Sequence, residues 1–87
     1  MAQVFIPASL RPHANGTRVI DLPGETVRDL ILALETQYPL LVGRLREGDS
    51  LRPGLSVAID SKLSVQGLRQ AVPPQCEVHF LPTIGGG

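Results

Sequence analysis

One amphipathic segment, residues 27–38, limits how this chain can fold. Thr26 followed by Asp29 matches a capping box, in which both side chains accept hydrogen bonds from free backbone N–H groups at a helix start. Apolar residues then recur at helical spacing and form a single stripe: Val27, Leu30, Ile31, Leu34 and Tyr38. Pro39 disfavours helical geometry at Tyr38. The sequence therefore predicts one main helix with one face to bury.

Strand patterns precede this helix. Val4–Ala8 and Thr17–Leu22 have the composition of two strands, joined by a loop through Pro12. The loop ends in Asn15-Gly16, a pair suited to the positive φ values of a tight turn. These features predict a β-hairpin.

Further strand patterns follow the helix. Residues 40–45 are expected to form another turn or short helix, and residues 47–50 a polar loop. Leu55, Val57 and Ile59 alternate with smaller or polar residues, which predicts a half-buried strand. Leu63, Val65 and Leu68 are expected to supply a short strand and a connector. Cys76, Val78 and Phe80 repeat the alternation in a last strand, with Glu77 and His79 facing away.

The order of these elements predicts an α+β domain of β-grasp type, with one main helix covering a mixed sheet. That topology requires the last strand to pair with the first in the centre of the sheet. We therefore expect a domain over residues 1–82 and a flexible C-terminal glycine tail over residues 83–87. Pro82 is expected to stiffen the exit of this tail.

Composition limits which residue types can form the core and which classes of partner are expected. Hydrophobic residues make up 43% of the 87 residues and aromatic residues 3%, so the core must consist of Leu, Val and Ile, with Phe5, Phe80 and Tyr38 as the large fillers. Basic and acidic residues balance at eight each, which disfavours nucleic acid as a partner. No apolar run is long enough for a bilayer and no leader precedes the first strand, so we expect no membrane partner and a soluble protein in the cytoplasm.

Motifs of autonomous catalysis are missing. The sequence holds no G-x-S-x-G, H-E-x-x-H, Walker A or Rossmann glycine pattern, which argues against an enzyme acting alone. The single Cys76 is expected to point inward and to be inert, and it can form no intramolecular disulfide. His13 and His79 are given ordinary surface roles, so no metal or bound cofactor is expected. Asp29 is interpreted as a helix cap, and Arg11 and Arg44 as solvated surface residues.

The chain ends in Gly85, Gly86 and Gly87 directly after the last strand pattern. A terminus without Cβ atoms can be threaded into a narrow channel of a partner enzyme. Ordering three glycines costs roughly several kcal/mol, which docking of the folded body must offset. We therefore expect a partner that binds both the folded domain and the tail. A frayed terminus or a cloning remnant are the alternatives.

A resemblance becomes specific at two places. The segment Gly24-Glu25-Thr26-Val27-Arg28-Asp29-Leu30 followed by Tyr38-Pro39, together with the ending from Glu77 to Gly87, resembles the ThiS/MoaD family of ubiquitin-like sulfur carriers over essentially the whole chain. Within that family, the opening from Ile6 to His13 followed by Gly16 resembles the branch that serves cysteine biosynthesis.

The resemblance implies a mechanism. An E1-like adenylyltransferase would use ATP to convert the Gly87 carboxylate into an acyl adenylate, with Gly85 and Gly86 threaded into its channel. A sulfur donor would then displace AMP and leave a thiocarboxylate. The carrier would deliver this sulfur to an acceptor synthase, which in the cysteine branch depends on pyridoxal phosphate, and a metalloprotease would release the product. The carrier itself would be a co-substrate and would bind no cofactor.

Alternatives stay open within and beyond this class. Thiamine and molybdopterin carriers share the activated terminus, as does a ubiquitin-like modifier of lysines. A plain interaction module would have an incidental tail. The family usually closes with two glycines after a larger residue, whereas three follow Ile84 here, so Gly87 is either the acceptor or an extra residue removed first. For docking, we predict apolar side chains exposed near the last strand, on the sheet face away from the helix.

Overall fold

The computed structural model describes residues 1–82. In chain order its elements are β1 (Ala2–Phe5), the 3-10 helix η1 (Ala8–Ala14), β2 (Val19–Leu22), α1 (Val27–Gln37), η2 (Pro39–Leu41), β3 (Arg46–Glu47), β4 (Ser50–Leu51), β5 (Leu55–Ile59), β6 (Lys62–Leu63), η3 (Gly67–Arg69) and β7 (Glu77–Pro82). The predicted tail, residues 83–87, lies outside the described residues, so the division of the chain at residue 82 stays a prediction.

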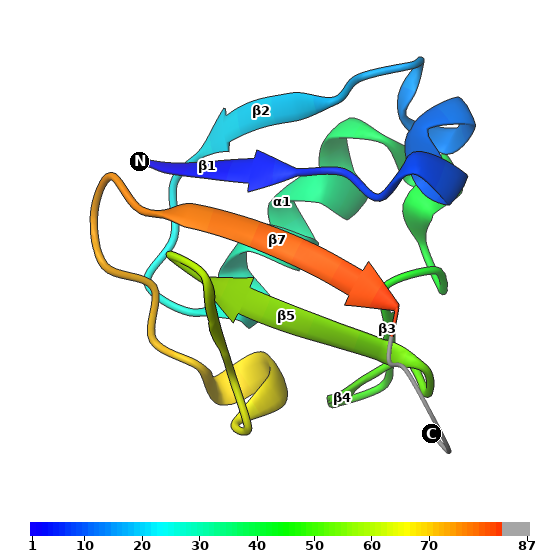
Figure 1. Cartoon of the computed structure of the whole chain (residues 1–87). Coiled ribbons are helices and arrows are strands. Elements are labelled where there is room, and N and C mark those ends of the chain that lie inside the picture. Colours follow the sequence, from blue (N-terminus) through cyan, green and yellow to red (C-terminus); the bar gives the residue numbers. More distant parts are fainter. Residues whose placement is uncertain (83–87) are drawn as a thin grey trace.

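Five strands form one mixed sheet in the order β2-β1-β7-β5-β6. β1 and β7 run parallel, while the β1–β2, β5–β7 and β5–β6 pairs are antiparallel. Helix α1 crosses one face of this sheet (Figure 1). The structure confirms the predicted α+β arrangement of β-grasp type, including the pairing of the last strand with the first in the sheet centre.

Helix α1 begins and ends where the sequence predicts. Thr26 Oγ1 accepts a hydrogen bond from the Asp29 N–H (3.3 Å), and Asp29 Oδ2 accepts one from the Thr26 N–H (3.2 Å), which completes the capping box. The helix stops at Gln37, and Pro39 opens η2. Four stripe residues are fully buried and Tyr38 packs against the core at its edge; the four are Val27, Leu30, Ile31 and Leu34.

The capping carboxylate makes the fold sensitive to acid. The Glu25 N–H, which donates to Asp29 Oδ2 at 2.9 Å, and the Thr26 N–H hold the pKa of Asp29 below its ordinary value of 3.8. A carboxyl whose pKa is lower in the folded state stabilises the fold above its unfolded pKa, and this stabilisation is lost as pH falls through the folded pKa. We expect Asp29→Asn to be less stable than the wild type at neutral pH and the two to converge below pH 3.8. Urea titrations of both proteins across pH 2.5 to 7 check this, and a difference that persists at the acid end would contradict it.

The core between α1 and the sheet is aliphatic, as the composition predicts. Phe80 is buried in it, and Val4, Val57 and Val78 approach α1 from three neighbouring strands. The expected role of Phe5 as a core filler is wrong. Val4 on β1 faces the core, so the next residue, Phe5, projects from the opposite face of the sheet, where it is only half-buried.

The first strand and its loop differ from the prediction. β1 ends at Phe5, not at Ala8, and β2 begins at Val19, not at Thr17. The 3-10 helix η1 fills most of the expected loop, because Pro7 has no N–H to donate to a strand neighbour. It ends at Ala14, and Asn15 (φ 55°) and Gly16 (φ 77°) follow with positive φ values, which confirms the predicted turn.

The polar loop over residues 47–50 is a small hairpin. β3 and β4 pair antiparallel, Arg46 with Leu51 and Glu47 with Ser50. Arg46 also makes a bidentate ion pair with Glu35 of α1, with N···O distances of 2.9 and 3.1 Å. Sequence reasoning missed this pair, which joins the hairpin to the helix.

Candidate docking site at the end of strand β7

The end of β7 is the last part of the chain that the structure describes. Leu81 pairs with Ser56 and Pro82 with Leu55, so β5 holds the last described residues in register. The predicted site residues Gly85, Gly86 and Gly87 lie outside the described residues, and their roles stay predictions. The structure does show that the strand leading to them is central and has neighbours on both sides (Figure 1).

On the sheet face away from α1, side chains of paired residues on neighbouring strands lie next to one another and form rows across the sheet. The middle row pairs Val19 with Phe5, Phe5 with His79 and His79 with Ala58. The Phe5 and His79 rings stack, with centroids 4.0 Å apart and planes 8° from parallel. Leu81 follows on the same face and is 38% exposed, and Val19 is 44% exposed. This confirms the predicted exposure of apolar side chains near the last strand; whether a partner docks there stays a prediction.

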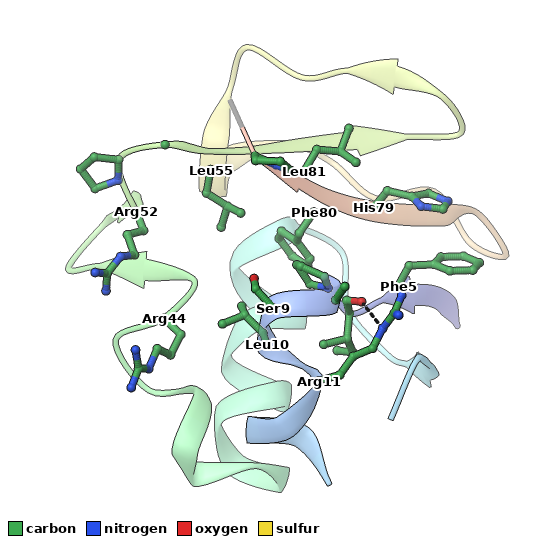
Figure 2. A pocket seen from close by; sticks show the side chains of 16 residues that line it. Phe5, Ser9, Leu10, Arg11, Arg44, Arg52, Leu55, His79, Phe80 and Leu81 are labelled. Atoms are coloured by element: carbon green, nitrogen blue, oxygen red, sulfur yellow. Dashed lines mark hydrogen bonds between the residues drawn. The ribbon is translucent and has the colours of Figure 1, made fainter. Parts of the chain in front are cut away.

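A groove of about 780 Å³ lies at the end of β7 and is called the exit groove below. Its apolar side chains come from the end of β7, the start of β5 and the helix η1, as Figure 2 shows: Leu10, Leu55 and Phe80. Three arginines from separate segments complete it and are called the basic rim: Arg11, Arg44 and Arg52.

Two residues of the basic rim donate hydrogen bonds to backbone oxygens. Arg11 Nε donates to the Ile6 carbonyl at 3.2 Å, and Arg52 donates to the Gly43 carbonyl. Arg44 is exposed, as predicted, whereas Arg11 is half-buried and was wrongly expected to be merely solvated. No aspartate or glutamate is among the groove residues that the structure describes.

The titratable residues that the sequence singled out lie elsewhere or serve the fold. Cys76 is buried, as predicted, and desolvation, followed by the charge of Asp60, raises the pKa of its thiol. His79 stacks on Phe5, and His13 has a buried Nδ1 without a hydrogen-bond partner in residues 1–82. Within the same range, no group of three or more His, Cys, Asp or Glu residues could hold a metal ion. No helix of the described chain is long and apolar enough to cross a membrane.

A β-grasp body whose central last strand leads directly into a glycine-ended segment defines the class of ubiquitin-like carriers and modifiers. The chain belongs to the ThiS family, whose family model matches residues 4–87.

Individual relatives agree with this assignment. The chain is 31% identical to the sulfur carrier protein CysO of Mycobacterium tuberculosis over 97% of its own length and 96% of the relative's. The crystal structure of the Amycolatopsis orientalis BexX/CysO complex contains a chain that superposes with a TM-score of 0.88, 26% identity and full coverage of both chains. Small archaeal modifier protein 1 from Methanosarcina acetivorans gives a TM-score of 0.79 at 29% identity, covering 99% of this chain and 95% of that one.

Proposed function

We propose that this chain is a sulfur carrier protein whose Gly87 carboxylate is activated and converted to a thiocarboxylate, with cysteine biosynthesis as the preferred branch. The observation that carries the proposal is the likeness to CysO along nearly the whole of both chains, with the family match extending to residue 87. The chain acts as a protein co-substrate and not as an enzyme.

The proposed reaction needs a partner enzyme that activates the carboxylate with ATP, and a source of sulfur. In the first step the carboxylate attacks the α-phosphate of ATP on an E1-like adenylyltransferase, and pyrophosphate leaves. Hydrosulfide then attacks the acyl carbon, AMP leaves and a proton is released, so the product carries one sulfur in place of one oxygen. The thiocarboxylate sulfur is a nucleophile that stays attached to a protein until an acceptor uses it.

The acceptor is proposed to be a synthase that holds pyridoxal phosphate, followed by a metalloprotease that releases the product. A CysO chain forms a complex with BexX in the Amycolatopsis orientalis crystal structure, so that chain assembles with another protein. ATP belongs to the adenylyltransferase, and the carrier holds no cofactor of its own. A cytoplasmic location fits a pathway that consumes ATP and stays a prediction.

Intact-protein mass spectrometry tests the proposal. The chain is incubated with the E1-like adenylyltransferase encoded nearest to its gene, ATP and hydrosulfide. Candidate acceptor synthases are then added to identify the biosynthetic pathway that receives the sulfur. We expect a mass increase equal to replacement of one oxygen by sulfur, absent without ATP. A cysteine-forming synthase and its amino-acid substrate should then add further mass, because the product stays attached to the chain, and the metalloprotease should restore the original mass by releasing it. No mass change with an enzyme that hydrolyses ATP in the chain's presence would contradict the carrier function.

Protein modification is the second candidate function. The likeness to small archaeal modifier protein 1 favours it, because that protein shares the fold at 29% identity. Both functions use an activated terminus, so recovery of isopeptide conjugates from cells, with Gly87 linked to lysine, is the result that would favour the modifier.

A further inference from the structure

Carboxylates lie at the start of β7, and three arginines lie near its end. At the start of β7, Glu77 pairs with Gln3, which pairs with Asp21, and the Glu77 N–H donates to Asp60 Oδ1 at 2.8 Å. At the far end of the same strand lies the basic rim of Arg11, Arg44 and Arg52. The whole chain has equal numbers of basic and acidic residues, so the positive charge of the exit groove is a local concentration.

The basic rim differs from the other arginines near the hairpin. Arg28 contacts Asp49 at 2.6 Å and Arg46 contacts Glu35 at 2.9 Å, so both have carboxylate partners. The rim arginines form no ion pair with any described residue. A guanidinium group is opposite in charge to a carboxylate and fits its planar geometry. Such charge complementarity mainly increases the association rate and orients the partner.

The groove also presents an apolar surface next to these charges. Leu10 and Leu55 are half-buried there, and Phe80 is buried next to them. In Figure 2, Arg44 and Arg52 lie together on one side of these leucines and Arg11 on another. An occupant that fits must therefore carry an apolar side chain with carboxylates on either side of it.

We infer that the exit groove docks an acidic segment of a partner protein, in which an apolar residue is flanked by aspartates or glutamates. The inference rests on the proposed function, since the partner meant is one that receives the residues following β7. Docking at the end of β7 places the partner where the tail leaves the domain. It also offsets the conformational cost of ordering three glycines in that partner's channel.

Two other occupants are weaker. The chain's own terminal carboxylate would bring one negative charge to three arginines, and fixing its glycines costs more conformational freedom than exposed ion pairs return. A second copy could set its Glu77 end against the basic rim, but it would then cover the strand end that a partner must reach.

The test is an NMR titration of the ¹⁵N-labelled full chain with defined peptides. The probe is acetyl-Glu-Asp-Leu-Glu-Asp-amide, and the controls are acetyl-Lys-Lys-Leu-Lys-Lys-amide and a version of the probe with glycine in place of leucine. We expect the probe alone to shift the amides of Leu10, Leu55 and Leu81, with an affinity of about millimolar. Arg44→Gln/Arg52→Gln should weaken it about tenfold. The matched control Lys62→Gln/Arg69→Gln removes the same charge outside the groove and should leave the affinity unchanged.

Several results would overturn the inference. Equal shifts from the lysine peptide, or equal weakening by both double variants, would show that the groove does not select acidic segments. Tighter probe binding to a chain ending at Pro82 would show that the tail occupies the groove. Shifts that depend on chain concentration without peptide would assign the groove to a second copy.

A kinetic measurement separates this inference from the proposed function. With the adenylyltransferase, Arg44→Gln/Arg52→Gln should raise KM for the chain about tenfold and leave kcat unchanged. An unchanged KM with normal sulfur transfer overturns the inference for that partner and leaves the carrier function standing. A wild-type chain that is never converted contradicts the carrier function, while the peptide titration still decides what the groove binds.

Discussion

Replacing Leu30 by alanine is expected to lower the free energy of unfolding by about 3 kcal/mol. Leu30 is fully buried at the centre of the stripe that α1 packs on the sheet. Alanine removes its apolar contacts and leaves a cavity that the strands cannot fill without moving. A domain of 87 residues has a total stability of roughly 4–13 kcal/mol, so this single change removes a large share of it.

The same helix provides the matched control. Leu32 is 40% exposed, so Leu32→Ala removes little buried surface and improves helix propensity. We expect its effect to stay within about 0.5 kcal/mol. Urea denaturation followed by circular dichroism measures both variants, and equal losses at the two positions would show that the stripe does not form the core.

Local signals explain why α1 could be predicted closely. Thr26, Asp29 and Pro39 act on backbone groups within four residues, so their effect does not depend on the rest of the fold. The sheet order followed from the sequence of elements, because few topologies satisfy it. Strand ends were less accurate: Pro7 stops β1 early, and η1 replaces a loop.

The β3–β4 hairpin and the Arg46–Glu35 pair were missed because they depend on contacts between segments, whereas the error on Phe5 was local. β3 and β4 have two residues each, too short for an alternation to be visible, and the Arg46–Glu35 pair that anchors them spans eleven positions. Phe5 was assigned to the core because it is large and apolar. The alternation of Val4 and Ile6 around it already indicated the opposite face.

The exit groove shows the same limit for the site. Arg11, Arg44 and Arg52 belong to three separate segments, and only the folded topology brings them to the end of β7. The glycine ending was visible in the sequence, but the charged surface at the end of β7 was not. The sequence and its family resemblance therefore identified the glycine tail as the reactive end. The structure was needed to find the groove that we infer binds a partner.

Changing the length of the glycine ending is expected to abolish sulfur transfer without changing stability. One alanine appended after Gly87 moves the carboxylate by one residue and introduces a Cβ where a narrow channel would exclude it. Nucleophilic attack requires the carboxylate at a fixed place beside ATP, and small misplacements cost orders of magnitude in rate. We expect no detectable thiocarboxylate by intact-protein mass spectrometry, while the urea midpoint stays that of the wild type, because the core lies within residues 1–82.

Two further chains make this prediction decisive. An alanine added before Met1 changes the mass equally and should leave sulfur transfer intact, since Met1 is exposed at the opposite end of β1 from the exit groove. A chain that ends at Gly86 distinguishes the two interpretations of the third glycine. If Gly87 is the acceptor, this chain loses transfer as the extended one does. If Gly87 is first removed, the shortened chain is converted at least as fast as the wild type, and the assignment of Gly87 is wrong.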